Sequence, residues 1–269
     1  MPSHQLRRLW RKCLVTKIIV NDSLTWQPGK TTIELGAEFI DLWRVDLSNP
    51  DLGRPDILSD DECRRADKFA FDAGRNNYVR SRCTLRRILA GCLGCAADKI
   101  EFCYNEHDKP ELAMADVDMV QFNLSHSGGT ALIGVAKNRR VGVDVNSLGR
   151  NSGWTAIAKR TFSATEQASF FAQPEESQEK DFYRVWSQKE AYTKAIGDGF
   201  SYGFRNFSVV VDAGNRAGLL ADDKSPASVR QWSIISIDVG SNFVAALAFD
   251  GANSPVIRRW EFHSQRVNI

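Results

Sequence analysis

Apolar residues recur along this chain at two spacings, which separate predicted helices from predicted strands. Between Tyr78 and Leu93 they recur every three or four residues, which places them on one face of a helix that Gly94 ends. The other face of this segment is basic. A second long helix is predicted from about Glu179 to Ile196, directly before Gly197.

Two shorter helices are predicted from capping boxes, in which a serine and the glutamate three residues later satisfy each other's backbone amides. The first box is Ser59 to Glu62, and the second is Ser163 to Glu166, which opens a helix through Phe171. Runs rich in β-branched residues predict strands between the helices. These runs are Val120 to Leu124, Thr130 to Ala136, Arg140 to Val145, Phe207 to Val211, Trp232 to Val239 and Phe243 to Phe249.

The order of these elements predicts an α/β chain made of two halves. Each half holds one long helix and several strands, and the seam falls near Lys137-Asn138-Arg139, which gives units of 1–137 and 138–269. A chain of 269 residues fits either one elaborate domain or two halves of ~130 residues. The sequence shows no repeat strong enough to prove duplication.

Composition indicates a soluble globular protein, with 43% hydrophobic and 25% charged residues. No apolar run of ~18 residues could span a bilayer, so we expect no membrane partner. The basic start (Arg7, Arg8, Arg11 and Lys12) is followed by an apolar stretch that Lys17 interrupts, and no cleavage site follows. A cytoplasmic protein is therefore expected. A net charge of +2 argues against general nucleic-acid binding.

The six cysteines do not form a recognisable metal motif. Cys92-Leu-Gly-Cys95 has the spacing of half a zinc knuckle, but the second half is missing. We therefore expect buried free thiols. The cysteines are Cys13, Cys63, Cys83, Cys92, Cys95 and Cys103.

Polar oxygens share one face of the strand predicted after residue 139. In Val141 to Asn146, alternation places the valines on one face and Gly142, Asp144 and Asn146 on the other. A carboxylate two residues from an amide carbonyl suits Mg²⁺, which takes few protein oxygens and completes its shell with water and phosphates. The alternative is a strand with a solvated polar face.

The second long helix carries an acid and a base on one stripe, because Trp186, Glu190 and Lys194 follow one another at intervals of four. An exposed ion pair is the alternative interpretation. The neighbouring apolar residues argue against it, because they predict that this face is partly buried and that the carboxylate needs a cation. These neighbours are Phe182, Tyr183, Val185 and Tyr192.

Asn123 to Gly129 reads as a loop whose hydroxyls, imidazole and glycines can approach phosphate oxygens. A serine hydrolase is the rival, but the chain lacks the G-x-S-x-G elbow at this point. Ser125 and His126 would also project to opposite sides of an extended strand. A plain polar turn stays open as an alternative.

Cations suited to phosphate binding lie earlier in the chain. Lys109 occupies a turn, and a basic face runs from Arg65 to Arg86. Arg87 is expected to be a solvated surface cation.

Four segments in this order make the chain resemble the long Sfp-type phosphopantetheinyl transferases. The match runs from about Ser59 to Phe207, and little of it lies in residues 1–40 or after Asp212. The segments are F-N-L-S-H-S-G-G, V-G-V-D-V, F-S-A-T-E and W-S-Q-K-E-A-Y-T-K-A-I-G-D-G.

The resemblance implies a pseudo-dimer of two α/β halves, each a small, mostly antiparallel sheet with a long helix, and an active site in the cleft between them. It implies transfer of the 4′-phosphopantetheine arm of coenzyme A to a serine of an apo acyl, peptidyl or aryl carrier protein. Magnesium, with manganese as a substitute, would be held by Asp144 and Glu190. The family commonly has Glu at the position of Asn146, which here either ligates through its carbonyl or leaves the metal to the other groups.

The resemblance also assigns roles around the metal. It implies that Glu190 is the base, directly or through a water on the metal, and that Lys194 and His126 stabilise the developing charge. Coenzyme A contacts are implied for Arg65, Lys68, Arg75, Arg82, Lys109, Ser125, His126 and Lys194.

A monomer is expected from the internal pseudo-dimer. Two alternatives remain open: an inactive protein of this fold that binds coenzyme A or a carrier, and a nucleic-acid-binding protein that uses Arg7 to Lys12 and Lys137 to Arg140.

Overall fold

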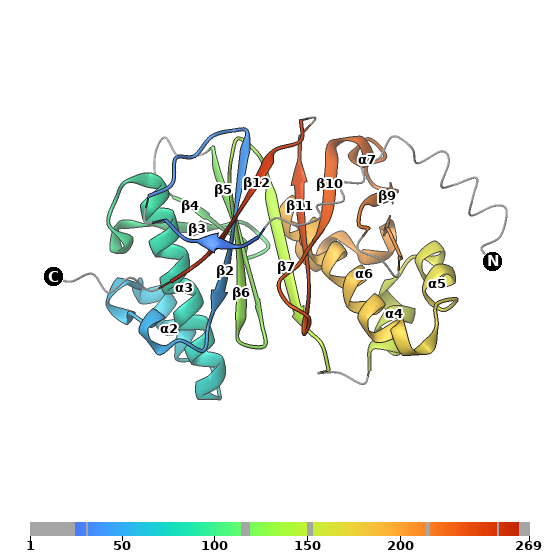
Figure 1. Ribbon diagram of the computed structural model, residues 1–269, viewed down its shortest axis with the longest axis horizontal. Helices are drawn as coiled ribbons and strands as arrows, with labels where there is room; N and C mark the ends of the chain where they lie inside the picture. Colours follow the sequence, from blue (N-terminus) through green and yellow to red (C-terminus); the bar gives the residue numbers. More distant parts are fainter. Residues whose placement is uncertain are drawn as a thin grey trace.

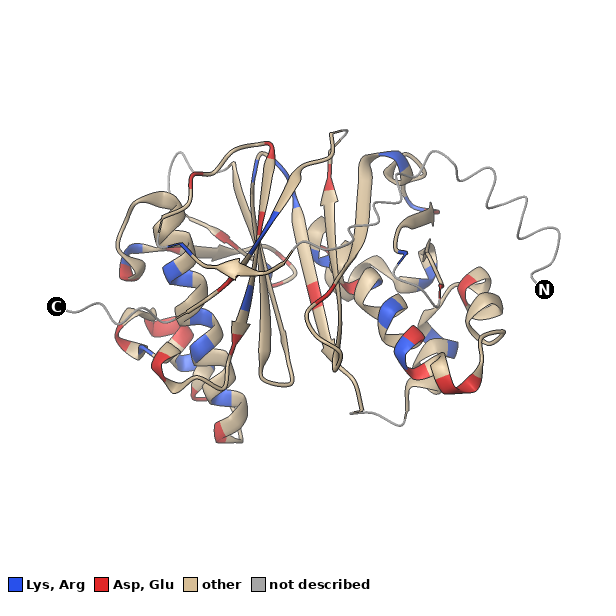
Figure 2. Cartoon of the chain, viewed as in Figure 1, with Lys and Arg blue, Asp and Glu red and all other residues tan. Residues whose placement is uncertain are grey.

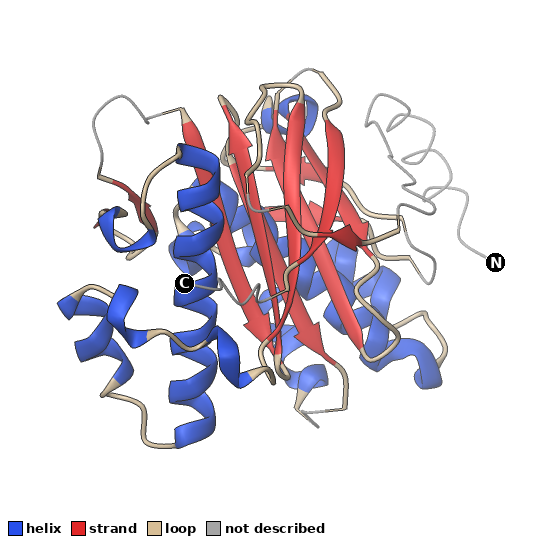
Figure 3. Cartoon of the chain, turned by 60° about the vertical axis from the view of Figure 1, so that its left-hand side comes forward, coloured by secondary structure: helices blue, strands red, loops and turns tan. Residues whose placement is uncertain are grey.

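Two β-sheets pack face to face, and the two longest helices cover their outer sides (Figure 1). The computed structural model describes residues 25–30, 32–113, 119–149, 153–212, 216–251 and 253–263. Figure 3 shows the strands of both sheets running between the helices.

The first sheet is built mainly from β2 (Phe39–Asp46), β6 (Thr130–Lys137) and β5 (Val120–Ser127), which pair antiparallel in that order. Helix α3 (Asp72–Leu93) covers this sheet, and α2 (Asp60–Ala66) precedes α3. The remaining elements of this half are β1 (Gln27–Pro28), η1 (Pro50–Leu52), η2 (Pro55–Ile57), η3 (Ala97–Lys99), β3 (Phe102–Tyr104) and β4 (Pro110–Leu112).

The second sheet repeats this arrangement with β7 (Val141–Ser147), β11 (Phe243–Asp250) and β10 (Trp232–Ile237), again antiparallel. Helix α6 (Glu175–Ile196) covers it, and α5 (Ala164–Phe170) precedes α6. The remaining elements are α4 (Trp154–Thr161), η4 (Gly199–Tyr202), η5 (Phe204–Asn206), β8 (Phe207–Val209), β9 (Leu219–Asp222) and α7 (Ser228–Gln231).

The last strand, β12 (Val256–Glu261), returns to the first sheet and pairs parallel with β2. Buried Asp41 on β2 accepts hydrogen bonds there from Arg258 at 2.7 Å and from the indole of Trp260 at 2.7 Å. The division at residue 137 stays a prediction, and β12 crosses it.

Three apolar cores correspond to the three interfaces between the layers. One lies between α3 and the first sheet, one between α6 and the second sheet, and one between the two sheets. Leu42 and Leu132 meet Val143 and Leu247 in the core between the sheets. Each large apolar side chain buried in this way contributes about 1.5–3 kcal/mol to stability. The halves are therefore joined by a continuous core.

The predicted fold class is confirmed: the halves are similar, and each has a mostly antiparallel sheet and a long helix. Both capping boxes are present, with the serine and glutamate hydrogen bonded reciprocally. Helix α3 begins at Asp72 instead of Tyr78. Strand β2 escaped prediction because the charged residues Asp41 and Arg44 interrupt its apolar alternation.

In the part of the chain that the structure describes, no helix is long and apolar enough to cross a bilayer. The five described cysteines are free thiols. Burial was expected and is confirmed for Cys83, whereas Cys103 is exposed on the short strand β3, so the expectation is wrong there. Cys13 and the basic residues Arg7, Arg8, Arg11 and Lys12 lie outside the described residues.

Candidate active site

Strand β7 directs its polar residues toward α6. Val141, Val143 and Val145 fill the core between the sheets, so Gly142, Asp144 and Asn146 face the helix, as alternation predicts. A Cβ at Gly142 would overlap the carbonyl oxygen of Ala191 and the amide of Ala195 on α6. Glycine at this position therefore lets the strand approach the helix closely.

Asp144 accepts hydrogen bonds from side chains of three elements: α6, β5 and its own strand, β7. Lys194 on α6 places Nζ 2.6 Å from Asp144 Oδ1 and 3.2 Å from Ser125 Oγ on β5. Ser125 Oγ donates to the same Asp144 oxygen at 3.0 Å. Asp144 is 5% exposed, so its charge is held by these contacts and not by bulk water.

Asn146 engages the other oxygen of Asp144. Its Nδ2 donates to Asp144 Oδ2 at 2.6 Å and to Ser187 Oγ on α6 at 3.0 Å. Ser187 is fully buried and lies one turn before Glu190. Both oxygens of Asp144 therefore accept hydrogen bonds from side chains.

Glu190 differs from Asp144 because no hydrogen bond reaches its carboxylate from the residues that the structure describes. It is 9% exposed, and this burial raises its pKa to about 7. The positive charge of Lys194 opposes the rise, and the negative charge of Asp144 adds to it. The site thus holds one carboxylate that is paired with Lys194 and one that receives no hydrogen bond from the described part of the chain.

Side chains of β5 link the first sheet to the second, because they accept hydrogen bonds from backbone amides of β7. The pairs are Val143 N to Asn123 Oδ1 at 2.9 Å, Val145 N to Ser125 Oγ at 3.3 Å and Ser147 N to Ser127 Oγ at 3.1 Å. The predicted loop was wrong here, since 123–127 belongs to β5 and only Gly128 and Gly129 form the turn. The alternation of Asn123, Ser125 and Ser127 was the signal for an extended strand with one polar face.

His126 follows Ser125 on β5 and is exposed. Withdrawal of water from the ring by the surrounding protein lowers the pKa of His126, and the positive charge of Lys194 lowers it further. A neutral imidazole keeps one N–H donor and one acceptor.

Lys109 meets the end of α6. Its Nζ donates to the carbonyl of Ala195 at 3.2 Å, and Asn105 Nδ2 donates to the carbonyl of Gly197 at 3.1 Å. Burial lowers the pKa of Lys109. These contacts fix the turn between β3 and β4 against the helix that carries Glu190 and Lys194.

Lysine and arginine positions are spread over the helices of the first half (Figure 2), and the predicted cations among them occupy different environments. Lys68 is exposed, and exposed Arg75 pairs with Asp67 at 3.3 Å. Arg65 pairs with Asp61 at 2.9 Å and stacks over the ring of Tyr104 at 4.1 Å.

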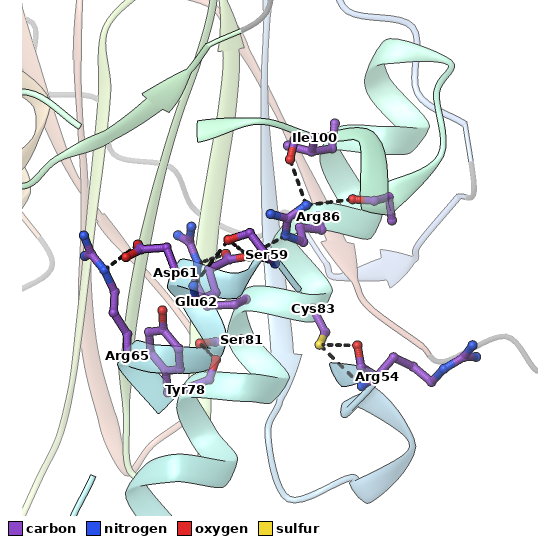
Figure 4. A network of polar contacts seen from close by, with 12 residues as sticks. Arg54, Ser59, Asp61, Glu62, Arg65, Tyr78, Ser81, Cys83, Arg86 and Ile100 are labelled. Atoms are coloured by element: carbon purple, nitrogen blue, oxygen red, sulfur yellow. Dashed lines mark hydrogen bonds and ion pairs between the residues drawn. The ribbon is translucent and has the colours of Figure 1, made fainter. Parts of the chain in front are cut away.

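Arg82 is 6% exposed and binds Glu62 at 2.6 Å. Arg86 binds the second oxygen of Glu62 at 2.7 Å, in the network of Figure 4. Arg82 Nη2 is buried without an acceptor in the described residues. Arg87 is half-buried and donates to the carbonyl of Leu52 at 3.3 Å, so the expectation of a solvated surface cation is wrong.

The donor set at the site consists of two carboxylates and an amide. Groups of three or more His, Cys, Asp or Glu side chains that could hold a metal are absent from the described residues. Oxygen donors in small number are what Mg²⁺ takes from proteins, because substrate phosphates and water complete its shell. The Glu190 carboxylate, which accepts no hydrogen bond within the described ranges and interacts electrostatically with Asp144, fits such a cation.

Comparison with known proteins gives matches to both halves. Residues 53–138 match the family "4′-phosphopantetheinyl transferase, N-terminal", and residues 140–248 match the "4′-phosphopantetheinyl transferase superfamily". The chain is 34% identical over 232 residues to the 4′-phosphopantetheinyl transferase HetI of Nostoc sp., covering 84% of this chain and 94% of that protein. It is 31% identical over 175 residues to the 4′-phosphopantetheinyl transferase Sfp of Bacillus subtilis, covering 65% and 75%.

Proposed function

The chain belongs to the 4′-phosphopantetheinyl transferase superfamily, and we propose that it moves the phosphopantetheine arm of coenzyme A onto a carrier-protein serine with a magnesium ion bound at Asp144 and Glu190. The observation that carries the metal assignment is the buried Glu190 carboxylate, which no hydrogen bond from the described residues reaches. A buried carboxylate without a partner is costly, and a cation removes that cost.

Magnesium, or manganese in its place, would be held by Asp144 and Glu190, with the carbonyl oxygen of Asn146 as a third group. When bound, the ion supplies positive charge to the pyrophosphate oxygens of coenzyme A. Lys194 adds a second positive charge from the same side, because its Nζ contacts Asp144.

In the reaction, the serine Oγ of the carrier forms a bond to the phosphorus that bears pantetheine. The bond from that phosphorus to the bridging oxygen breaks, and adenosine 3′,5′-bisphosphate leaves. Glu190 accepts the serine proton, directly or through a water molecule. Lys194 and the neutral His126 donate to the phosphate oxygens on which charge accumulates.

Coenzyme A would be held from both halves. Ser125, His126 and Lys109 lie near the ends of β5 and α6 and would contact the pyrophosphate. Arg65, Lys68 and Arg75 are the accessible cations for the 3′-phosphate. Arg82 is engaged with Glu62 in the interior, which supports a structural contribution, and its part in coenzyme A binding stays a prediction.

The test is to incubate the protein with coenzyme A, magnesium and an apo acyl or peptidyl carrier protein, and then to weigh the carrier. A mass gain of one phosphopantetheine that disappears with EDTA is the expected result. Binding of coenzyme A or carrier without a mass gain would favour the alternative of a binding protein, for which Asn146 is the observation. A mass gain that EDTA leaves unchanged would refute the metal.

A further inference from the structure

Asn146 uses both of its amide hydrogens inside the site. One reaches Asp144 Oδ2 at 2.6 Å and the other reaches Ser187 Oγ at 3.0 Å. Ser187 is fully buried on α6, so it fixes the direction in which the amide points. The amide nitrogen faces Asp144 on the strand, and the helix holds it there.

We propose that Asn146 is a latch for the metal-free site: one of its N–H groups holds Asp144 in place when no cation is bound, the other is held by Ser187, and the amide releases the Asp144 oxygen to the metal. The inference rests on the metal of the proposed function. It concerns the metal-free protein, which assays of transfer do not report on.

The balance of charge gives the reason. When Glu190 is ionised, Asp144, Glu190 and Lys194 bring two carboxylates and one ammonium into the site, which leaves one net negative charge. The amide adds no charge and donates to Asp144, so all donors that Asp144 needs come from Lys194, Ser125 and Asn146. A carboxylate at residue 146 could not donate, and it would add a second net negative charge beside Asp144 and Glu190.

Two consequences follow for this chain. The metal-free protein is more stable with Asn146 than with a carboxylate there, because the repulsion is absent and the hydrogen bond to Asp144 is present. Metal binding is weaker than with a carboxylate, because an amide brings less charge to a divalent cation. Asn146 thus lowers the affinity for the metal and, in return, keeps the side chains of the metal-free site in position.

The experiment measures melting temperature with EDTA and with magnesium for the wild type, Asn146→Asp and Asn146→Leu. With EDTA, both variants should melt roughly 3–6 °C below the wild type, because each loses the charge-assisted hydrogen bond to Asp144. Magnesium should restore Asn146→Asp, which gains a carboxylate ligand, and should not restore Asn146→Leu. Calorimetric titration with Mn²⁺ should show tighter binding to Asn146→Asp and weaker binding to Asn146→Leu.

Asn123→Leu is the matched control, since Asn123 is also an amide that supports β7, but it accepts a hydrogen bond from the backbone of Val143 and makes none to a carboxylate of the described residues. It should lower the melting temperature equally with EDTA and with magnesium. Equal melting of the wild type and Asn146→Asp in EDTA would overturn the latch. If magnesium leaves the wild type unchanged, the metal of the proposed function fails, while the comparison in EDTA still decides whether Asn146 stabilises the metal-free site.

Discussion

The two halves are built on one plan, and only the second carries the acidic residues of the site. Helices α3 and α6 are both 22 residues long and end at glycines with positive φ, Gly94 and Gly197. Each is preceded by a short helix that opens with a serine–glutamate capping box. The same helices and caps therefore form in the first half without the acidic residues that the second half carries.

A buried ion pair ties the short helix to the long one in each half. Glu62 binds Arg82 and Arg86 on α3, and Glu166 binds Lys189 on α6 at 2.7 Å. Both glutamates also accept a hydrogen bond from the backbone amide of the serine that caps their helix. The glutamate of each capping box therefore also ties its short helix to the long helix through a buried ion pair. We call each of these ion pairs a buried clamp; their contribution is to the fold.

The strands next to the helices show where the halves diverge. Leu47 N donates to Gly129 O just after β2, and Leu148 N donates to Asn242 O just after β7, so the two strands can be compared residue by residue. Trp43 then corresponds to Asp144, and Val45 corresponds to Asn146.

The side of β2 that faces α3 contributes to an apolar core, since Trp43 is 2% exposed and Val45 is fully buried. On the helices, Arg87 takes the place of Glu190. Different residues at a few corresponding positions therefore distinguish the apolar core beneath α3 from the polar site beneath α6.

The largest expected effect comes from exchanging the corresponding helix residues for alanine. Glu190→Ala should reduce transfer on the order of a thousandfold or more, because it removes a carboxylate that holds the metal. Arg87→Ala should leave turnover within a few-fold, since the only hydrogen bond that its side chain makes to the described residues is to the carbonyl of Leu52, far from the acidic residues of the site in sequence and on the other helix. Single-turnover rates at saturating coenzyme A measure both, and an equal loss in the two variants would refute the difference between the halves.

The buried clamps should be equally important in the two halves. Glu62→Ala leaves two buried arginines and Lys189→Met leaves one buried glutamate without the oppositely charged partner, so each should lower the free energy of unfolding by about 3–5 kcal/mol. Urea denaturation measures this loss. Arg54→Ala, at an exposed pair with Asp56, is the control and should leave the midpoint unchanged. A loss confined to one half would show that the clamps are not equivalent.

Glu190 should make the metal-free protein sensitive to pH. Its pKa in the folded protein, about 7, lies above the ordinary 4.5, so the folded state binds the proton more tightly. The associated stability is complete below pH 4.5 and is lost as the pH rises through 7, by roughly 3 kcal/mol. Unfolding in EDTA across this range should reveal the loss, and Glu190→Gln should remove it. A pH profile identical in the two proteins would contradict the assignment.

The smallest effect is expected in the first half at Lys109. Lys109→Ala should raise the KM for coenzyme A up to roughly tenfold with little change in kcat, because a phosphate contact made before the reaction contributes uniform binding. Asn105→Ala removes the neighbouring contact to α6 but keeps the cation, and its KM should stay near that of the wild type. If both variants raise KM equally, Lys109 acts through the position of the turn and not through its charge.

Local spacing was sufficient to predict which side chains lie together at the centre of the candidate site. The period of two along β7 placed Asp144 and Asn146 together, and the period of four along α6 placed Glu190 and Lys194 together. The capping boxes were likewise readable, because each involves residues three apart. The resemblance to a family then indicated that the two faces meet.

Contacts between distant elements could not be read in this way. The hydrogen bonds from β7 to Asn123, Ser125 and Ser127 depend on which sheet edges meet. Arg82 shares a basic helix face with Arg75 in the sequence, yet Glu62 on another helix draws it into the interior. Strand β2 was hidden because the partners that allow Asp41 to be buried, Arg258 and Trp260, come from the end of the chain.

The central claim is that transfer depends on the polar face of β7. The most direct measurement is the intact mass of an apo carrier protein after incubation with coenzyme A, magnesium and each of three proteins: the wild type, Asp144→Ala and Asp46→Ala. Asp46 lies at the exposed end of β2, and its side chain accepts a hydrogen bond only from the amide of Ser48 among the described residues, which makes it a suitable control carboxylate in the first half. We expect a gain of one phosphopantetheine with the wild type and Asp46→Ala and none with Asp144→Ala. A full gain with Asp144→Ala, in a protein that is folded, would contradict the account.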